Sequence, residues 1–532
     1  MSTFNYAELL GIVARTVPDR LAIVCGESRL SYQELHRQVD LFARVLEAQG
    51  LRRGDTMALH LYNSPEYLVA FFAACRLGVL PFNVNYRYVE PEIAYLYGKA
   101  RAAAAVVSAE FVSRLAGLAN PLALAIVVGG ADSVMPSQAR VAMAFDQALQ
   151  RAASWPSPSG AASSDDQLMI YTGGTTGLPK GVVWTQEDML YAALGGAGFF
   201  SRVGPIRAPE ELRDRVLESP PLVTFPVPPL MHGAALWATL ASIFAGHTIV
   251  LDAGRQFDAE RVLDVVARES VNVLTIVGDG MAQPLVAALE SQAGRWDLSR
   301  LVHIGSGGAV FSVAVQQALK RHLPRVTTQS SLGSTESGTL GPTSAPVTEG
   351  LMRYSPRADL AVIFDGNRFA AIGETGVLAR TGRLPVGYLG DPEKTAQTFV
   401  TVEGRRFSLT GDFARVEADG SMVVLGRGST CINTGGEKVY PEEVEQALKG
   451  CAGVDDALVV GVPDPRWGEK VVAVVAPRRD CAPDAEALRA HCRQSLAGYK
   501  VPREIVIVSA VQRTNTGKPD YNWAREACAP RD

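Results

Sequence analysis

The sequence has no hydrophobic run long enough to cross a membrane. Its most apolar stretch covers residues 234–251, but Gly246 and His247 interrupt it before it reaches the roughly 20 apolar residues that a spanning helix requires. We therefore expect a buried helix, a turn and a strand there. The seven cysteines include no C-x-x-C pair, and their number is odd. This spacing indicates neither a disulfide framework nor a zinc site.

A strong excess of charge of one sign is also absent. The formal net charge is −4 and the pI is about 6.1, so no basic surface is expected to bind nucleic acid or an anionic membrane. Residues 1–20 carry Glu8 inside an apolar stretch and lack the charge pattern of a signal peptide, so we expect an amphipathic helix. These observations favour a cytoplasmic protein that acts on a small molecule, and they leave a homodimer open.

The chain is too long for a single compact core, and its composition is that of a globular protein. It has 532 residues, of which 47% are hydrophobic and 20% charged, so we expect a large domain and at least one smaller one. Short β-branched runs at 21–26, 56–61 and 104–109 alternate with helix-length segments such as 31–49. This alternation predicts an α/β fold with layered sheets and helices.

A Ser-, Pro- and Ala-rich segment at 151–166 precedes the strand expected at 167–172. It is either a loop that leads to a functional site or a plain surface linker. Strands expected at 271–277 and 300–305 and a helix at 310–321 extend the large domain past the middle of the chain. The expected organisation is an N-terminal domain at 1–426, a hinge at 427–430 and an α+β C-terminal domain at 431–532.

The most informative motif is YTGGTTGLPKGV at 171–182. Its glycines leave the backbone free to wrap an anion, its threonines add hydroxyl donors, and its lysine adds a positive charge. Pro179 precedes the lysine, so the order of a Walker P-loop is absent. The polyphosphate-binding residues are expected to be Thr172, Gly173, Gly174, Thr175, Thr176 and Lys180.

This loop resembles the signature of the adenylate-forming superfamily, which includes acyl-CoA synthetases. The resemblance implies a large N-terminal domain, a small mobile C-terminal domain, and ATP and Mg²⁺ bound between them. It also implies that Thr176 takes part in catalysis and binds the metal ion. In acyl-CoA synthetases the second substrate is coenzyme A.

Two further motifs are similar to the family's acyl pocket. PPLMHGAALW at 228–237 places His232 and Gly233 at the mouth of that pocket, although a histidine in an apolar run is by itself more typical of a core. Amino-acid-activating relatives have an aspartate in this region; its absence favours a hydrophobic acid. HIGSGGAVFS at 303–312 is either a simple entry into a helix or the wall behind adenine and acyl group. The resemblance assigns that wall to Gly305, Gly307 and Gly308.

QSSLGSTESG at 329–338 resembles the family's Y-G-x-T-E element. The resemblance assigns nucleotide and substrate contacts to Ser331, Leu332, Gly333 and Ser334, an α-phosphate contact to Thr335, and Mg²⁺ coordination to Glu336. A carboxylate suits this hard cation. Leu332 stands where an aromatic residue commonly stacks on adenine, so apolar contact is expected without ring stacking.

The remaining motifs fall towards the end of the chain. In SLTGDFARV, Asp412 matches the family's ribose-binding aspartate, and Arg427 is expected to make a second ribose or phosphate contact at the hinge. Ser429 and Thr430 replace a common Lys-Asp pair there. The loop 433–445 matches the family's CoA-binding loop, which the resemblance assigns to Gly435, Gly436, Glu437 and Lys438. Lys518 matches its catalytic lysine.

The resemblance covers essentially the whole chain and is strongest to bacterial synthetases that act on steroid side chains and other bulky polycyclic acids. It implies an ATP-dependent acyl-CoA synthetase that forms an acyl-adenylate and then a thioester. Three alternatives stay open at this point. They are a medium- or long-chain fatty acyl-CoA synthetase, an acyl-AMP ligase that loads a carrier protein, and a non-catalytic adenylate-binding protein.

Overall fold

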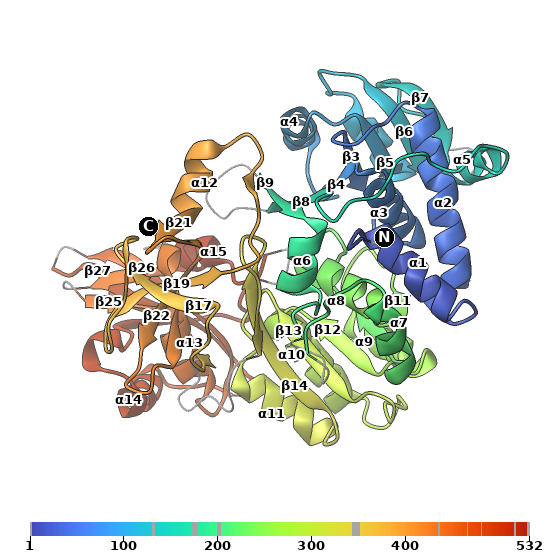
Figure 1. Ribbon diagram of the computed structural model, residues 1–532. Coiled ribbons are helices and arrows are strands. Elements are labelled where there is room, and N and C mark those ends of the chain that lie inside the picture. Colours follow the sequence, from blue (N-terminus) through green and yellow to red (C-terminus); the bar gives the residue numbers. More distant parts are fainter. Residues whose placement is uncertain are drawn as a thin grey trace.

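The computed structural model describes residues 3–129, 134–172, 179–198, 204–342, 352–434, 437–464, 466–479, 481–514 and 518–528. Strands in these residues form four sheets. Figure 1 shows the N-terminal strands at the upper right and the strands that follow β16 at the left. We call the three sheets formed by β1–β23 and their helices the large lobe, and the last sheet with its helices the C-terminal lobe.

The first sheet is parallel through its centre and antiparallel at both edges. Its order is β15-β14-β13-β12-β10-β11-β1-β2. The strands are β1 (Leu21–Cys25), β2 (Ser28–Ser31), β10 (Val223–Pro226), β11 (Thr248–Leu251), β12 (Val273–Ile276), β13 (His303–Gly307), β14 (Thr327–Ser334) and β15 (Gly338–Pro342).

The second sheet has the order β20-β9-β8-β4-β3-β5-β6-β7. Its strands are β3 (Thr56–His60), β4 (Leu80–Asn83), β5 (Ala104–Ser108), β6 (Leu122–Val128), β7 (Ala139–Ala144), β8 (Gln167–Thr172), β9 (Lys180–Thr185) and β20 (Gly387–Tyr388). Helices α1 (Tyr6–Thr16), α2 (Tyr32–Ala48), α3 (Pro65–Leu77) and α8 (Gly233–Phe244) pack in one buried core with residues of the first and second sheets.

The outer faces of these two sheets carry further helices. Helix α4 (Glu90–Ala100) and the 3₁₀ helix η1 (Ala109–Leu115) share a core with the second sheet. Helices α9 (Ala259–Arg268), α10 (Gly278–Ser291) and α11 (Val313–His322) share a core with the first sheet. The lobe is therefore layered as predicted, with helices on both sides of each sheet.

The third sheet is antiparallel and has the order β16-β23-β22-β19-β17-β18, with β21 paired to β22. Its strands are β16 (Arg353–Tyr354), β17 (Leu360–Phe364), β18 (Arg368–Phe369), β19 (Thr375–Thr381), β21 (Phe399–Val402), β22 (Arg405–Val416) and β23 (Met422–Arg427). The remaining helices of the large lobe are α5 (Phe145–Ala152), α6 (Gln186–Ala193), α7 (Glu211–Glu218) and α12 (Pro392–Thr398).

The C-terminal lobe begins after the short 3₁₀ helix η3 (Gly428–Thr430). Its sheet has the order β25-β24-β27-β26, with β28 beside β27. The elements are β24 (Ile432–Thr434), β25 (Glu437–Val439), α13 (Pro441–Lys449), β26 (Val454–Asp464), β27 (Gly468–Pro477), α14 (Ala485–Ser495), η4 (Gly498–Lys500), β28 (Glu504–Ile507) and α15 (Tyr521–Ala527). Helices α13 and α14 cover one face of β26 and β27, and α15 covers the other.

Most expected elements are present, and three begin later than predicted. The strand expected at 271–277 is β12, which starts at Val273. The strand expected at 300–305 is β13, which starts at His303 because Leu301 is still in a turn, its N–H bonded to the carbonyl of Leu298. The helix expected at 310–321 is α11, which starts at Val313 because the Ser312 side chain caps it. Residues 234–251 form α8 and β11, as predicted. Among the described helices, none is both long and apolar enough to span a bilayer.

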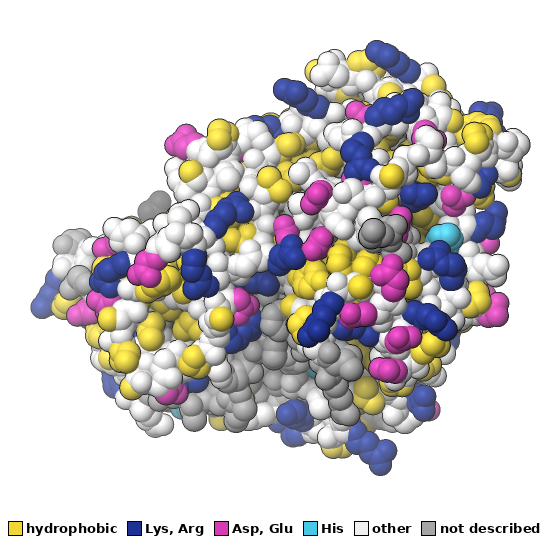
Figure 2. All heavy atoms as spheres, in the orientation of Figure 1, with side chains coloured by type: hydrophobic (Ala, Val, Ile, Leu, Met, Phe, Trp, Pro, Cys, Tyr) yellow, Lys and Arg dark blue, Asp and Glu magenta, His cyan; other side chains and the backbone are white. Residues whose placement is uncertain are grey.

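The surface agrees with the small net charge. On the face shown in Figure 2, cationic and anionic side chains are interspersed over the described residues. On this face the mixing leaves no extended region of one sign among the described residues.

Candidate active site

A cavity of about 2690 Å³ lies at the strand ends of the large lobe. Residues of the C-terminal lobe also line it. Ligands bind outside the carboxyl ends of parallel strands in open α/β sheets, and β8, β10, β13 and β14 all end at this cavity. Its volume exceeds the roughly 300–1,000 Å³ of a typical small-molecule site. The predicted site residues that line it are Thr172, His232, Gly233, Gly305, Gly307, Gly308, Ser331, Leu332, Gly333, Ser334, Thr335, Glu336, Asp412, Arg427 and Lys518.

Other predicted site residues lie elsewhere. Lys180 opens β9 opposite Thr172, and its Nζ is 5.7 Å from the ring centroid of Tyr388. Glu437 and Lys438 belong to β25, which pairs with β24, and Glu437 is not among the described residues that line the cavity. Gly173, Gly174, Thr175, Thr176, Gly435 and Gly436 lie outside the described residues.

Glu336 sits in the turn between β14 and β15, and its carboxylate and backbone are both held. Its Oε1 accepts a hydrogen bond from the Tyr388 hydroxyl at 2.9 Å, and its carbonyl accepts one from the Ser408 hydroxyl at 2.7 Å. The neighbouring Thr335 carbonyl accepts a bond from the Trp184 indole N–H at 2.8 Å. Three separate elements therefore fix this turn at the cavity wall.

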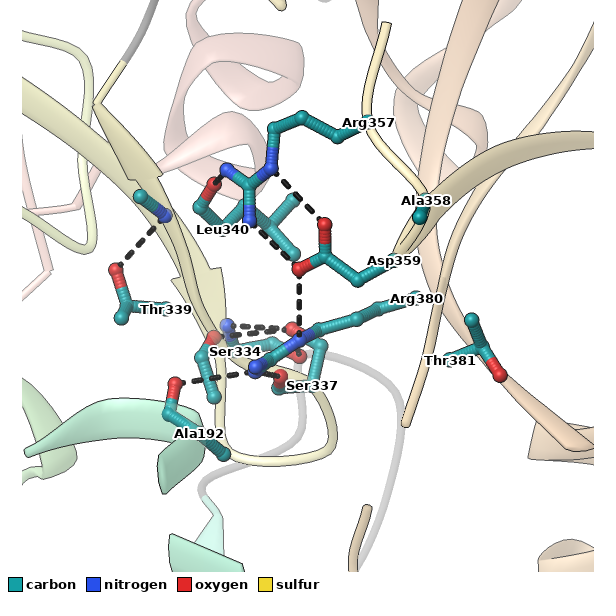
Figure 3. Close-up of polar contacts among 12 residues, drawn as sticks. Ala192, Ser334, Ser337, Thr339, Leu340, Arg357, Ala358, Asp359, Arg380 and Thr381 are labelled. Carbon is teal, nitrogen blue, oxygen red and sulfur yellow. Dashed lines mark hydrogen bonds and ion pairs between the residues drawn. The ribbon is translucent and has the colours of Figure 1, made fainter. Parts of the chain in front are cut away.

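An ion-pair network with a buried arginine lies behind the same turn (Figure 3). Arg380 on β19 is 3% exposed and donates to the carbonyls of Ser337 and Ala192, so that it ties the turn to α6. The Asp359 carboxylate accepts two hydrogen bonds from Arg357, one from Nε and one from Nη2. It also lies 3.9 Å from Arg380 Nε. Burial lowers the pKa of Arg380 to about 10, against the opposing effect of Asp359, so Arg380 stays charged at neutral pH.

Gly338 explains how the guanidinium can approach so closely. The residue has φ +69°, and a Cβ on it would lie 2.7 Å from Arg380 Nη1 and 2.8 Å from the Ala192 carbonyl oxygen. Only glycine is free of both strain and clash there.

We expect Arg380→Lys to slow acyl-adenylate formation about tenfold, because the shorter lysine side chain cannot bring its nitrogen to the position of Nη1, which donates to both carbonyls. Pyrophosphate-exchange kinetics measure this effect. The matched control is Arg383→Lys, whose exposed guanidinium pairs with Glu187 and Asp188 at 2.9 and 3.0 Å and should change the rate little. Equal rates in Arg380→Lys and Arg383→Lys would show that the network does not position the turn.

Asp412 and Arg427 are paired across β22 and β23, at the last residue before η3. Asp412 is 5% exposed, and the Arg427 Nε lies 3.4 Å from its Oδ1. Burial raises the pKa of Asp412, whereas Arg427 lowers it. A carboxylate with this one close cation has acceptor capacity left for the hydroxyl groups of a ligand.

Glu442 of α13 lies directly beneath this pair. Its Oε1 accepts a hydrogen bond from the Arg427 N–H at 3.3 Å, and burial raises its pKa to about 7. Gly426, at φ +143°, makes room for it, since a Cβ there would lie 2.2 Å from Glu442 Oε2. The start of the C-terminal lobe is thus packed against the end of the large lobe.

Lys518 lies in a turn of the C-terminal lobe that reaches the cavity. Loss of surrounding water within the cavity and the charge of Arg427 lower its pKa, whereas Glu336 raises it, so the ammonium shares the cavity with both groups. Its backbone is held by Thr514, whose N–H donates to the Lys518 carbonyl at 2.8 Å. The structure therefore brings the Lys518, Glu336 and Arg427 side chains together from three distant motifs.

His232 immediately precedes α8 and lines the same cavity. Burial lowers its pKa to about 4, with further lowering by Lys518 and Arg87, so the imidazole is neutral at pH 7. Its Nε2 is buried and has no hydrogen-bond partner among the described residues. A neutral ring in this position can contribute shape and one hydrogen bond to a ligand, but no charge.

Some residues of the site were not predicted from the sequence. Tyr388, Trp184 and Arg380 all fix the Glu336 turn, yet each lies far from it in sequence. Tyr388 lies in the two-residue strand β20, shortly before Asp391, the N-cap of α12, and this local pattern does not reveal the role of the hydroxyl.

Joining AMP to a carboxylic acid requires a pocket for the acid next to a nucleotide site, and a cation that can reach the reacting oxygens. The cavity is a single space with room for both the acid and the nucleotide. Lys518 of the C-terminal lobe lines it. The arrangement fits an adenylate-forming ligase, the class that the sequence motifs resemble.

Comparisons with known proteins agree. A family model described as AMP-binding enzyme matches residues 12–378, and one described as AMP-binding enzyme C-terminal domain matches residues 443–518. The chain belongs to the AMP-binding enzyme family.

Similar proteins are known at the level of sequence and of structure. The chain is 40% identical to the medium/long-chain-fatty-acid–CoA/3-oxocholest-4-en-26-oate–CoA ligase of Mycobacterium marinum, over 99% of this chain and 97% of that protein. It is 37% identical to the 3-oxocholest-4-en-26-oate–CoA ligase of Rhodococcus rhodochrous, over 98% and 95%. The anthranilate CoA ligase AuaEII, solved with anthranoyl-AMP, has the same fold, with a TM-score of 0.80 at 22% identity over 98% and 96% of the chains.

The family and these relatives confirm the predicted class. The protein is an acid–thiol ligase that uses ATP and coenzyme A to form an acyl-CoA through an acyl-adenylate. The two other mechanistic classes, carrier-protein loading and adenylate binding without catalysis, are correspondingly disfavoured.

Proposed function

We propose that this enzyme activates a bulky, hydrophobic carboxylic acid of the steroid or terpenoid type. The observation that carries this proposal is the extension of the cavity along one face of α8. Small side chains line it at Gly233, Ala234, Ala238, Ala241 and Ala245. At 1.5 Å per residue the stretch from Gly233 to Ala245 is about 18 Å long. Trp237 and Phe244 also line the cavity, and the small side chains beside them leave room for a wide, rigid substrate.

The names of the relatives support the same substrate class. Both the Mycobacterium marinum and the Rhodococcus rhodochrous ligases are named for a cholestenoate. A second candidate substrate is a medium- or long-chain fatty acid, because the name of the Mycobacterium marinum ligase also includes this class. A straight chain would fill the same apolar face less completely.

The test is a thioester screen with ATP and free CoA that runs from acetate through long-chain fatty acids to sterol and diterpenoid acids. We expect the highest kcat/KM with the polycyclic acids. A maximum at a straight-chain acid would favour the second candidate. Turnover with an acyl-carrier protein but not with free CoA would contradict the choice of acceptor.

We expect Ala241→Phe to lower kcat/KM for a sterol acid about a hundredfold, because the ring would fill the distal part of the α8 face. The scale follows from overpacking costs of about 1–3 kcal/mol, since 1.4 kcal/mol is a tenfold change. The same variant with a short acid is the control, and its kcat/KM should stay within about threefold. Equal losses for both acids would place the substrate elsewhere.

In the proposed mechanism the acid enters past His232, with its carboxylate towards Lys518. Asp412 accepts hydrogen bonds from the ribose, and Arg427 holds the ribose or a phosphate. Thr335 lies beside the α-phosphate, and Gly307 and Gly308 support the adenine and the acyl group. The ammonium of Lys518 stabilises the negative charge that develops when the carboxylate displaces pyrophosphate.

The residues at the cavity also fit a magnesium ion. Among the described residues no group of three or more His, Cys, Asp or Glu side chains could hold a metal, and Mg²⁺ bound through ATP commonly uses only one or two protein carboxylates. Glu336 supplies one, held by Tyr388, and Thr176 is proposed as a further ligand. The bound ion would neutralise phosphate charge.

For thioester formation we propose that the C-terminal lobe turns about residues 427–430. This motion would withdraw Lys518 and bring residues 435–438, including Glu437 and Lys438, to the adenylate, where they would guide the CoA thiol. Glu437 of β25 is not among the described residues that line the cavity, which supports an orientation suited to adenylation. Thr430 donates a hydrogen bond to the Arg427 carbonyl at 3.0 Å. We propose Thr430 as the residue whose backbone conformation changes during this rotation.

The setting of the enzyme is also proposed. The seven cysteines, all within the described residues, form no disulfide with one another, which supports a reducing compartment such as the cytoplasm. A homodimer stays a prediction, which light scattering during gel filtration tests directly.

A further inference from the structure

A buried cluster of charged side chains joins the two lobes at a distance from the cavity. Asp279 stands in the first turn of α10 in the large lobe, and Lys449 ends α13 in the C-terminal lobe (Figure 1). The Lys449 Nζ lies 3.3 Å from Asp279 Oδ2 and 3.0 Å from Asp456 Oδ1. Arg513 Nη2 lies 2.5 Å from the other oxygen of Asp456. We call these four residues the inter-lobe cluster.

The inter-lobe cluster is neutral as a whole and almost fully excluded from water. The side chains of Lys449, Asp279 and Asp456 are 5%, 0% and 6% exposed. Burial opposes the charge of Lys449, yet Asp456 and Asp279 raise its pKa above the usual range. Burial likewise opposes the charge of Asp456, but Lys449 and Arg513 lower its pKa. Two carboxylates and two cations therefore compensate one another without solvent.

Asp279 is firmly held within the large lobe. Its Oδ1 accepts a hydrogen bond from the Ser312 N–H at 2.8 Å, and its own N–H donates to the Val310 carbonyl at 2.9 Å. One helical turn further along α10, the Gln283 amide donates to the Asp455 carbonyl at 2.6 Å. Helix α10 thus provides two polar contacts to the C-terminal lobe, and Asp279 is the charged one.

The other end of the inter-lobe cluster leads to Lys518. Arg513 forms an isolated β-bridge with Pro519, the residue after Lys518. Thr514, next to Arg513, donates from its N–H and its hydroxyl to the Lys518 carbonyl at 2.8 and 3.2 Å. An uninterrupted series of contacts therefore runs from α10 through Lys449, Asp456 and Arg513 to the backbone of Lys518.

We propose that Asp279 and Lys449 are positioning residues that hold the C-terminal lobe in the orientation in which Lys518 faces the cavity. This inference rests on the proposed function, and specifically on lobe rotation between the two half-reactions. Rotation would break the Asp279–Lys449 pair and leave Lys449, Asp456 and Arg513 together in the C-terminal lobe.

Charge compensation gives the proposal a specific test. Asp279→Asn keeps the acceptor for Ser312 but leaves an excess positive charge, and Lys449→Met leaves an excess negative one. We expect each variant to lower the rate of acyl-adenylate formation about tenfold or more. Thioester formation from ready-made acyl-adenylate should be unchanged or faster. The double variant leaves the neutral Asp456–Arg513 pair, so it should be less impaired in adenylation than the two single losses combined.

Lys470→Met is the matched control, because Lys470 pairs with Glu504 at 2.5 Å within the C-terminal lobe. It should leave both half-reactions at wild-type rates. Equal loss of both half-reactions in Asp279→Asn and Lys449→Met, or additive losses in the double variant, would overturn the positioning role.

A second measurement does not depend on activity. Arg427 is exposed and stands at the end of β23, so trypsin cleavage after it reports how firmly the lobes are held together. We expect faster cleavage in Asp279→Asn and Lys449→Met than in wild type or Lys470→Met. Unchanged cleavage would overturn the inference, whereas a wild-type enzyme that releases no pyrophosphate with any acid would overturn the proposed function instead.

Discussion

Replacing Lys518 with alanine is expected to slow acyl-adenylate formation at least about a hundredfold, the scale of removing one key electrostatic group from a transition state. The ammonium shares the cavity with Glu336 and Arg427, and the described cavity wall contains no other lysine from the C-terminal lobe. Thioester formation from synthetic acyl-adenylate should largely survive, because Lys518 is proposed to leave the site before that step. Stopped-flow assays of the two half-reactions measure the difference.

Two controls separate charge from structure. Lys518→Arg keeps a cation in the turn and should retain more adenylation activity than Lys518→Ala. Lys394→Ala removes an exposed ammonium that donates to the Gln397 side chain at 3.2 Å, and it should leave the rate unchanged. If Lys518→Ala impairs both half-reactions equally, the proposed division of roles between the two lobe orientations is wrong.

Replacing Glu336 with glutamine is expected to lower the adenylation rate by about two orders of magnitude. The amide keeps the size of the side chain and can still accept a hydrogen bond from Tyr388, but it removes the negative charge that a hard cation prefers. The Mg²⁺ concentration needed for half-maximal rate should therefore rise. Titration of the metal ion at saturating ATP measures this shift.

Tyr388→Phe is the matched control for Glu336. It removes only the hydroxyl that donates to Glu336 Oε1 at 2.9 Å, and the loss of one such bond costs about 1 kcal/mol. We expect a reduction of less than about tenfold, with a smaller change in the Mg²⁺ requirement. A Glu336→Gln enzyme with the metal requirement of wild type would contradict the proposed coordination.

The layered fold and the order of the site motifs were predictable from the sequence, because both depend on local patterns. Alternating apolar runs and helix-length segments indicated the sheets, and glycine-rich motifs marked the strand ends at which the cavity lies. The positions of His232, Glu336, Asp412 and Lys518 around one cavity followed from motif resemblance and are found together in the structure.

The supporting contacts were not predictable, because they join side chains to distant backbone. Arg380 reaches the Ala192 carbonyl across 188 positions, and Lys449 reaches Asp279 across 170. Neither pair has a local sequence pattern. Leu332, which stands where relatives commonly have an aromatic residue, packs against a core that includes Leu340 and Tyr354. It therefore provides the apolar contact without ring stacking that was expected at this position.

Asp412 and Arg427 are cross-strand partners that are proposed to bind the ribose, and Arg427 also begins the proposed hinge. Ribose binding and lobe rotation therefore depend on each other. Arg427 is the last residue of its strand, and Glu442 of the next helix accepts a hydrogen bond from its backbone N–H. A nucleotide that engages these side chains must therefore also restrain the pivot. Under the proposed mechanism, the kinetic order follows: pyrophosphate departs first, CoA enters only after rotation, and AMP leaves last, which corresponds to a ping-pong scheme rather than random addition.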